Sequence, residues 1–170
     1  MPDSLSKKII THPPASDSAD ISYHITGVRV PLFEVDLGQA VYHGNYFHLF
    51  EIGREDFLRQ IGFPYKEFMN RQLHLTIVES TCAYRKPLHY DDLIEIHTAI
   101  AWTRRRSIGF SQIIFREKEN GEKELCTRAD LNMVCVRFTG KPVVLPEDFM
   151  KIADDLALKK DRRKTGPDQK

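Results

Sequence analysis

The 170-residue sequence lacks long hydrophobic runs, and it has no large excess of charge of one sign. No stretch approaches the roughly 18 apolar residues that a membrane-spanning helix needs, and the N-terminal residues hold no apolar segment typical of a secretion signal. With 25 basic and 24 acidic residues the net charge is +1, which gives no reason to expect nucleic acid or a membrane surface as a partner. We therefore expect a cytoplasmic protein with no membrane span and no nucleic-acid partner.

Cysteine is scarce, and several catalytic motifs are missing. Cys82, Cys126 and Cys135 form no C-x-x-C pair and lie in runs typical of strands, which favours small core residues in a reduced compartment. The sequence has no H-E-x-x-H, no G-x-S-x-G and no phosphate-binding glycine loop. His43 and His48 are five residues apart, rather than the three or four that align two ligands on a helix. We expect no bound metal ion and no cofactor.

What remains is an ordinary globular composition, with 41% hydrophobic and 29% charged residues. A chain of this length and composition fits one domain with a sizeable core. Residues 1–20 have little apolar periodicity and are predicted to form a flexible leader. The folded domain is predicted over 21–150, and residues 151–170 are predicted to hold the end of a helix and a mobile basic tail.

The clearest helical pattern runs from Tyr46 to Ile61, where apolar residues recur at steps of three and four. It predicts an amphipathic helix that the Gly62-Phe63-Pro64 sequence ends. Gly53 costs up to about 1 kcal/mol in a helix interior, so it predicts a close approach to another element. The charged residues fall mostly on the other face and are predicted to be solvated ion-pair partners at i,i+3 and i,i+4 spacing: Glu51, Arg54, Glu55 and Arg59.

Strand-like runs lie on both sides of this helix. One precedes it at 22–35, and four follow it at about 73–84, 93–103, 107–117 and 124–138. Short connectors, and the Asn120-Gly121 pair, predict that the last three form an antiparallel meander. A helical turn at about 65–71 and a helix at about 147–158 complete the pattern. The predicted fold class is α+β, with an antiparallel sheet of about five strands around a central helix.

The stretch between the first strand and the helix has the composition of a catalytic loop. Asp36 is followed six and seven residues later by Tyr42 and His43, and the helix begins shortly afterwards. A carboxylate there could attack a carbonyl or deprotonate water, and the unpaired N–H groups of a helix start could stabilise a developing oxyanion. Taken alone, an Asp beside Gly38 is more often a turn residue that bonds its own backbone.

The spacing of Asp36, Tyr42 and His43 resembles that of the 4-hydroxybenzoyl-CoA thioesterase family, which has the hotdog fold. The resemblance covers about residues 22–148, including the helix at 46–63 and the Tyr84-Arg-Lys-Pro87 strand end. It implies hydrolysis of an acyl-CoA or acyl carrier protein thioester, with Asp36 as nucleophile or general base. It also implies a homodimer or homotetramer with its sites at the subunit interface.

The resemblance also assigns two finer features of the loop. The backbone N–H of His43 takes the position of the family's oxyanion donor, and the imidazole could also orient water or the thioester. Gln39 departs from the family pattern, because most members have glycine three residues after the aspartate.

Several residues are predicted to bind the substrate. Tyr42 and Tyr46 would line the acyl pocket, although aromatic residues at a helix start are as often core. Coenzyme A, as part of the substrate, carries phosphates that Arg104 and Arg105, with Ser107 nearby, could bind. Related enzymes use basic residues around the corresponding turn, whereas the plainer interpretation is an exposed, solvated turn.

Two other classes of function stay open from sequence alone. A hotdog protein could bind an acyl thioester without hydrolysing it, or could hydrate an enoyl thioester. An RNA-binding module could use 104–106 and the basic tail, although the near-neutral charge and the lack of an RNA motif disfavour it.

Overall fold

The structure is a computed structural model that describes residues 23–158, so the predicted leader and basic tail lie outside the described residues. Within 23–158, no helix combines the length and the apolar character needed to cross a bilayer. The elements in chain order are β1 (His24–Arg29), η1 (Leu32–Glu34), η2 (His43–Asn45), α1 (Tyr46–Gln60), α2 (Lys66–Asn70), β2 (Leu73–Tyr84), β3 (Leu93–Arg104), β4 (Ser107–Glu117), β5 (Lys123–Arg137) and α3 (Glu147–Leu156), where η marks a 3-10 helix.

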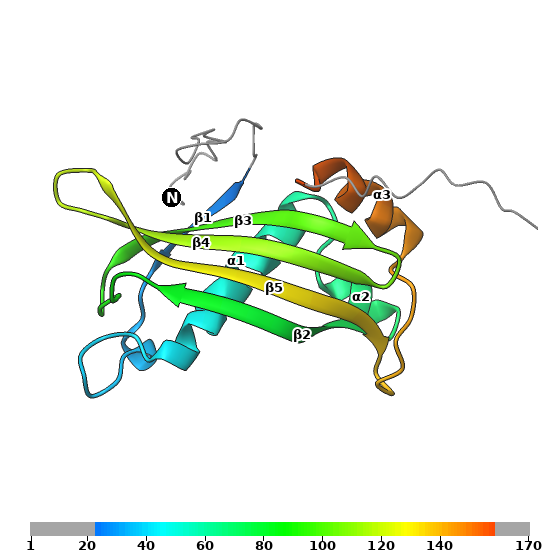
Figure 1. Ribbon diagram of the computed structural model, residues 1–170, viewed down its shortest axis with the longest axis horizontal. Coiled ribbons are helices and arrows are strands. Elements are labelled where there is room, and N and C mark those ends of the chain that lie inside the picture. Colours follow the sequence, from blue (N-terminus) through cyan, green and yellow to red (C-terminus); the bar gives the residue numbers. More distant parts are fainter. Residues whose placement is uncertain (1–22, 159–170) are drawn as a thin grey trace, which may run out of the picture.

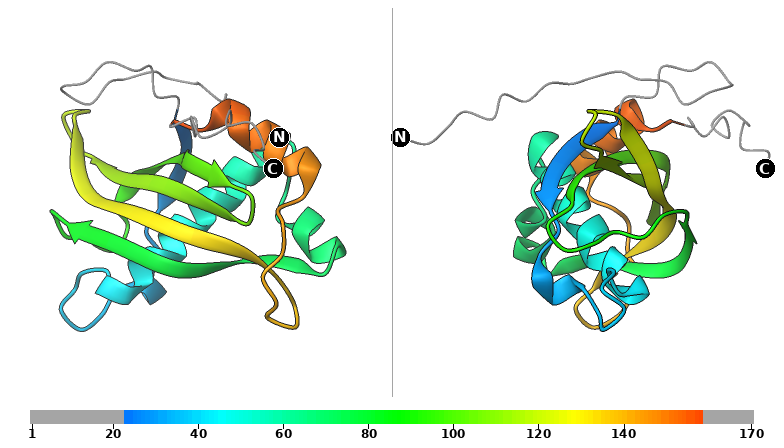
Figure 2. Two further views of the ribbon diagram at one scale, coloured as in Figure 1. Left: turned by 45° about the vertical axis from the view of Figure 1, so that its right-hand side comes forward. Right: turned by 90° about the vertical axis from the view of Figure 1, so that its left-hand side faces the viewer.

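The five strands form one antiparallel sheet in the order β1-β3-β4-β5-β2 (Figure 1). β3, β4 and β5 form the predicted meander, whereas β2 pairs with β5 instead of with either of its neighbours in sequence. The sheet curls around α1, as the end-on view in Figure 2 shows. The predicted α+β arrangement of a sheet around a central helix is therefore confirmed.

The central helix α1 has the predicted start and end. Gly62, at φ +79°, follows its last turn in the left-handed conformation that glycine adopts readily. A methyl group at Gly53 would lie 2.5 Å from Cγ2 of Ile96 and 3.0 Å from Oγ1 of Thr98. The predicted close approach at Gly53 is thus the contact between α1 and the middle of β3.

The first strand is shorter than the predicted run of 22–35. β1 ends at Arg29, and Pro31, which has no backbone N–H to continue a ladder, leads into η1. The chain returns to an extended form at Val35, which forms an isolated bridge with Val41. This early break creates the hairpin of residues 35–41 that carries Asp36.

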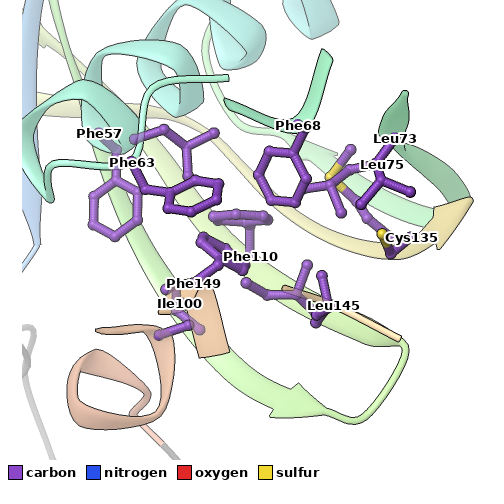
Figure 3. Close-up of a cluster of buried hydrophobic side chains, with 14 of the residues drawn as sticks. Phe57, Phe63, Phe68, Leu73, Leu75, Ile100, Phe110, Cys135, Leu145 and Phe149 are labelled. Carbon is purple, nitrogen blue, oxygen red and sulfur yellow. The ribbon is translucent and has the colours of Figure 1, made fainter. Parts of the chain in front are cut away.

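The core consists of two clusters of buried side chains between the helices and the sheet. The cluster in Figure 3 packs aromatic rings from α1, α2, β4 and α3 against one another, among them Phe57, Phe68, Phe110 and Phe149. Ala157 is buried in the same cluster, so the packed structure continues just beyond α3. All three cysteines are free thiols, and Cys126 and Cys135 are buried, as predicted for core residues.

Candidate active site

Asp36 lies at the base of a tight hairpin. The bridge between Val35 and Val41 closes the hairpin, and the Asp36 N–H donates to the carbonyl of Ala40 at 2.9 Å. One carboxylate oxygen of Asp36 accepts the N–H of Gly38 at 2.7 Å, and the residue is exposed. Asp36 thus makes the hydrogen bond of a turn residue with one oxygen, while the other oxygen accepts no hydrogen bond from residues 23–158.

The residue that departs from the family pattern keeps the conformation of a glycine. Gln39 has φ +63°, in the left-handed region that L residues other than Asn and Asp rarely adopt. Its N–H donates to the carbonyl of Asp36 at 3.0 Å, which closes the turn. The backbone at this position requires a left-handed conformation, which explains the glycine usual in the family. In this chain a glutamine adopts that conformation.

The start of the central helix presents N–H groups close to the hairpin base. η2 runs directly into α1 and begins two residues after Val41, where the hairpin closes. Within residues 23–158 the backbone N–H groups of His43 and Gly44 donate no hydrogen bond. Such groups at a helix start carry partial positive charge, so they can stabilise an oxyanion.

The end of β2 holds this helix start in place. The hydroxyl of Tyr84 donates to the carbonyl of His43 at 2.8 Å. Burial, together with a hydrogen bond to Cys82, raises the pKa of Tyr84 to about 12. The hydroxyl therefore keeps its proton at neutral pH and remains a donor to His43.

A buried carboxylate that the sequence analysis did not single out supports the same loop. Glu34, in η1, is almost fully buried, and its carboxylate oxygens lie 3.1 and 3.3 Å from Nδ1 of His48. Its carbonyl accepts from the N–H of Tyr42 at 3.0 Å and from the side chain of Asn45 at 3.1 Å. Glu34 was hidden from the sequence analysis because the run around it was interpreted as a strand.

The two tyrosines predicted to line the acyl pocket lie in different environments. Tyr42 is exposed, with its ring 4.2 Å from the ring of His43. Tyr46 is buried in the core, where its hydroxyl accepts the N–H of Leu88 at 3.1 Å, and burial raises the pKa of Tyr46. Tyr42 therefore lies on the surface next to the helix start, whereas the side chain of Tyr46 points into the core.

The predicted phosphate-binding residues lie at the opposite end of the sheet in the same chain. Arg104 and Arg105 are exposed where β3 turns into β4, and the guanidinium of Arg104 stacks on the ring of Trp102 at 5.0 Å. Figure 1 shows this turn at one end of the sheet and the 35–41 hairpin at the other. One chain by itself does not bring Arg104, Arg105 or Ser107 to Asp36.

The pairing of residues between neighbouring strands gives the distance between the arginine turn and the Asp36 hairpin. Arg104 pairs with Ser107, Ser107 with Val134, and Val134 with Thr76 of β2. Tyr84, which contacts His43, lies eight residues further along β2, a distance of about 26 Å along a strand. The arginine turn and the Asp36 hairpin are thus separated by most of the length of β2.

A pocket of about 470 Å³ opens beside β2 at the level of Thr76. α1, α2, β2, β4 and β5 form its walls. Leu58, Leu75, Phe110 and Met133 supply an apolar lining, and charged residues of α1 also face it. The pocket has the size and mostly apolar character of a small-molecule site.

One charged residue of this lining was predicted wrongly. Glu55 forms the predicted i,i+4 ion pair with Arg59 at 2.7 Å, but Arg54 is only 8% exposed and forms no ion pair within residues 23–158. Its guanidinium donates to Oε1 of Gln112 at 2.9 Å. The helical pattern places Arg54 on the polar face, but the curled sheet and α2 cover part of that face as well.

The described part of the chain has no cluster of three or more His, Cys, Asp or Glu side chains placed to hold a metal ion. The candidate site therefore consists of the Asp36 hairpin and the η2 N–H groups, with the pocket and the arginine turn about one strand length away. Together, the curled sheet, the central helix and this loop define a protein of the hotdog fold.

Comparisons with known proteins agree with this class. Residues 30–152 match the thioesterase-like superfamily. The acyl-CoA thioester hydrolase YbgC of Escherichia coli is 32% identical over 124 residues, which cover 72% of this chain and 90% of that protein. The solved structure of a DHNA-CoA thioesterase from Staphylococcus aureus has a TM-score of 0.72 at 26% identity, and the match covers 78% of this chain and 89% of that chain.

A solved structure of 4-hydroxybenzoyl-CoA thioesterase has a TM-score of 0.70 at 20% identity, covers 77% of this chain and 98% of that chain, and has the same fold. The chain belongs to the thioesterase-like superfamily. Both the predicted hotdog fold and the resemblance found in the sequence are confirmed.

Proposed function

We propose that this protein hydrolyses an acyl-CoA thioester to a free acid and coenzyme A, with Asp36 as the reacting carboxylate. The observation that carries the proposal is the hairpin of residues 35–41, which leads from Asp36 to a helix start whose first N–H groups have no acceptor within the described part of the chain. The names of the relatives in the same family, acyl-CoA thioester hydrolase and thioesterase, support the substrate class.

In the proposed reaction, the carboxylate of Asp36 attacks the thioester carbonyl or removes a proton from an attacking water. The backbone N–H of His43 binds the carbonyl oxygen as negative charge develops on it. Glu34 and Tyr84 hold the two sides of the loop by hydrogen bonds, so the donors need little rearrangement when the substrate arrives. His43 is the first residue of η2, and its exposed imidazole could assist as a second polar group.

A second copy of the chain is part of the proposal, because β2 is an unprotected edge. β2 pairs with β5 on one side only, and its central residues 77–81 are all exposed. Ile77 and Val78 place apolar side chains there, 40% and 61% exposed. A long edge strand with exposed apolar side chains favours pairing with another strand.

Antiparallel pairing of two β2 strands about the 77–81 stretch would reverse the ends of one sheet relative to the other. The Thr76 end of one β2, with its pocket and arginine turn, would then face the Tyr84 end of the other, which contacts His43. This arrangement would place Asp36 of one subunit at the same end of the paired sheets as Arg104 and Arg105 of the other. The 26 Å separation within one chain is thus what a shared site requires.

The decisive experiment is the variant Asp36→Asn. Asparagine keeps the size and the turn hydrogen bond to Gly38, but it cannot attack a thioester or accept a proton at neutral pH. We expect kcat to fall by at least about a hundredfold, the scale of general base catalysis, with an unchanged melting temperature and unchanged binding of a non-hydrolysable acyl-CoA.

Activity above roughly a tenth of the wild type, a barrier change of about 1.4 kcal/mol or less, would contradict the assignment. Wild-type protein that binds the analogue but hydrolyses no acyl-CoA would instead favour the non-hydrolytic alternative. A single turnover in ¹⁸O-labelled water then separates the two chemistries, because only direct attack by Asp36 leaves label in its carboxylate on release of the acid.

A further inference from the structure

The pocket beside β2 contains a buried guanidinium whose hydrogen-bonding capacity is mostly unused. Arg54 lines the pocket and is 8% exposed, and its one side-chain hydrogen bond within residues 23–158 goes from Nη1 to Gln112. A guanidinium has five N–H donors. Those on Nε and Nη2 are therefore available to a molecule that occupies the pocket.

Buried hydrogen bonds fix the orientation of this guanidinium. Gln112 is fully buried, and its Nε2 donates to the carbonyl of Phe50 at 2.8 Å and to Oγ1 of Thr98 at 2.9 Å. These contacts direct Oε1 of Gln112 toward Arg54. A fixed, buried acceptor thus positions the guanidinium before a ligand arrives, which reduces the entropy lost when a ligand binds.

The guanidinium of Arg54 forms no ion pair within residues 23–158. Glu51 and Glu55 line the same pocket and favour the charged form of Arg54, but Glu55 pairs with Arg59 and neither lies within ion-pair distance of Arg54. Burial lowers the pKa of Arg54, which reflects the unfavourable desolvation of its charge. Because the guanidinium is largely removed from water, an oxygen acceptor that enters the pocket binds it more strongly there than it would in water.

We propose that Arg54 recognises an oxygen acceptor on the acyl group, so that the preferred substrates carry a hydroxyl, keto or carboxylate oxygen at the end remote from the thioester. Leu58, Leu75 and Phe110 contact the hydrocarbon portion, and the guanidinium binds the oxygen. This inference rests on the proposed function for the identity of the ligand. Arg54 acts on substrate choice and takes no part in the bond cleavage.

The test compares matched acyl-CoA substrates on matched variants. The substrates are hexanoyl-CoA, 6-hydroxyhexanoyl-CoA and adipoyl-CoA, which differ only at the remote end of a six-carbon chain. The variants are Arg54→Met, which keeps the length and removes the donors, and Arg54→Lys, which keeps the charge. Arg59→Met is the control, since it removes an exposed arginine one turn away on the same helix.

We expect wild type and Arg59→Met to prefer at least one oxygenated substrate to hexanoyl-CoA by tenfold or more in kcat/KM. Arg54→Met should bring this ratio close to one by lowering only the oxygenated substrates, and Arg54→Lys should give an intermediate ratio. The more active of the two oxygenated substrates identifies a neutral or an anionic acceptor. No preference in the wild type, or a preference that survives in Arg54→Met, would overturn the proposal.

Binding measurements separate this inference from the proposed hydrolysis. The matching S-alkyl-CoA thioethers cannot be hydrolysed, so their affinities report on the pocket whether or not the protein is a hydrolase. Loss of the oxygen-dependent gain in affinity in Arg54→Met supports the role of Arg54 even if no thioester is turned over. If Arg54 instead pairs with a carboxylate of a second subunit, Arg54→Met will weaken self-association and change all three affinities equally, which also overturns the proposal.

Discussion

At the scale of single residues, Gln39 shows how a loop keeps its shape after losing its usual glycine. Its φ of +63° is left-handed, which costs an ordinary L residue about 1–2 kcal/mol. The hairpin supports this conformation through the hydrogen bond from the Gln39 N–H to Asp36 and the bridge from Val35 to Val41. The position of Asp36 therefore depends on a backbone conformation that the side chain at 39 must tolerate.

Two substitutions at Gln39 measure how much the left-handed backbone there costs in stability and activity. Gln39→Gly removes the steric cost but adds freedom to the unfolded chain, so we expect a change in the free energy of unfolding between zero and about +1 kcal/mol, with kcat retained. Gln39→Val places a β-branched residue at positive φ and should lower that free energy by about 1–3 kcal/mol and reduce kcat. Leu37→Val, at an exposed position of the same loop without positive φ, is the control, and equal denaturant midpoints for both valine variants would contradict the argument.

At the scale of elements, the distance between α1 and the sheet is set by the absence of a side chain at Gly53. The helix lies against β3 so closely that the Cβ of any other residue would overlap Ile96. The two core clusters extend along the inner face of the sheet on either side of this contact. A helix held at this distance keeps its N-terminal N–H groups fixed relative to the strands.

Gly53→Ala tests this contact. Alanine gains about 1 kcal/mol in helix propensity, but its methyl group must displace Ile96 or α1, and overpacking of this kind costs about 1–3 kcal/mol. We expect a net loss of up to about 2 kcal/mol, seen as a fall of several degrees in melting temperature. Gly27→Ala is the matched control, because nothing lies within 4 Å of a methyl group there, and its melting temperature should stay the same or rise.

At the scale of the whole molecule, the arrangement of the strands leaves β2 as the longer of the two free edges of the sheet. β1, the other edge, has only six residues, whereas β2 has twelve and exposes Ile77 and Val78. We expect light scattering at micromolar concentration to give a dimer or a dimer of dimers. Val78→Lys should weaken association by at least tenfold, because a charge on an edge strand opposes pairing.

The matched control for the edge is Leu125→Lys. Leu125 is also apolar and exposed, but it lies on β5, away from the free side of β2. This variant should associate as the wild type does. A monomer in the unmodified protein, or an equal effect of the two lysine substitutions, would be evidence against pairing through β2.

A shared site also predicts complementation between two defective chains. Arg104→Ala combined with Arg105→Ala should raise KM about tenfold and leave kcat nearly unchanged, because these residues would hold coenzyme A equally in the ground and transition states. When this variant is co-refolded with Asp36→Asn, mixed dimers contain one site with both parts intact. About a quarter of all sites should then be fully active by random assortment, as measured by kcat/KM.

Sites confined to single chains would give no such recovery. Activity would then equal only the average of the two separate variants. The control is the same mixing of each variant with itself, which should restore nothing.

Local sequence determined most of the helices and strands. The run from Tyr46 ends where Gly62 adopts a left-handed conformation, β2 and β4 have the predicted bounds, and the spacing of Asp36 and His43 identified the family. These features depend on residues close together in the chain, where helical periodicity, strand alternation and turn preferences act directly. The end of the first strand before Pro31 also depends on local sequence. The apolar residues on both sides of Pro31 nevertheless led to the prediction of one continuous strand.

Only the tertiary structure decided which parts meet. The pairing of β2 with β5, the burial of Arg54 against Gln112 and the separation of Arg104 from Asp36 all depend on contacts between residues far apart in the chain. A helical pattern distinguishes an apolar face from a polar one, but it does not say how far a curled sheet extends around the helix. For this reason the sequence indicated the candidate catalytic residues, whereas the pocket, its buried arginine and the free edge of β2 follow from packing.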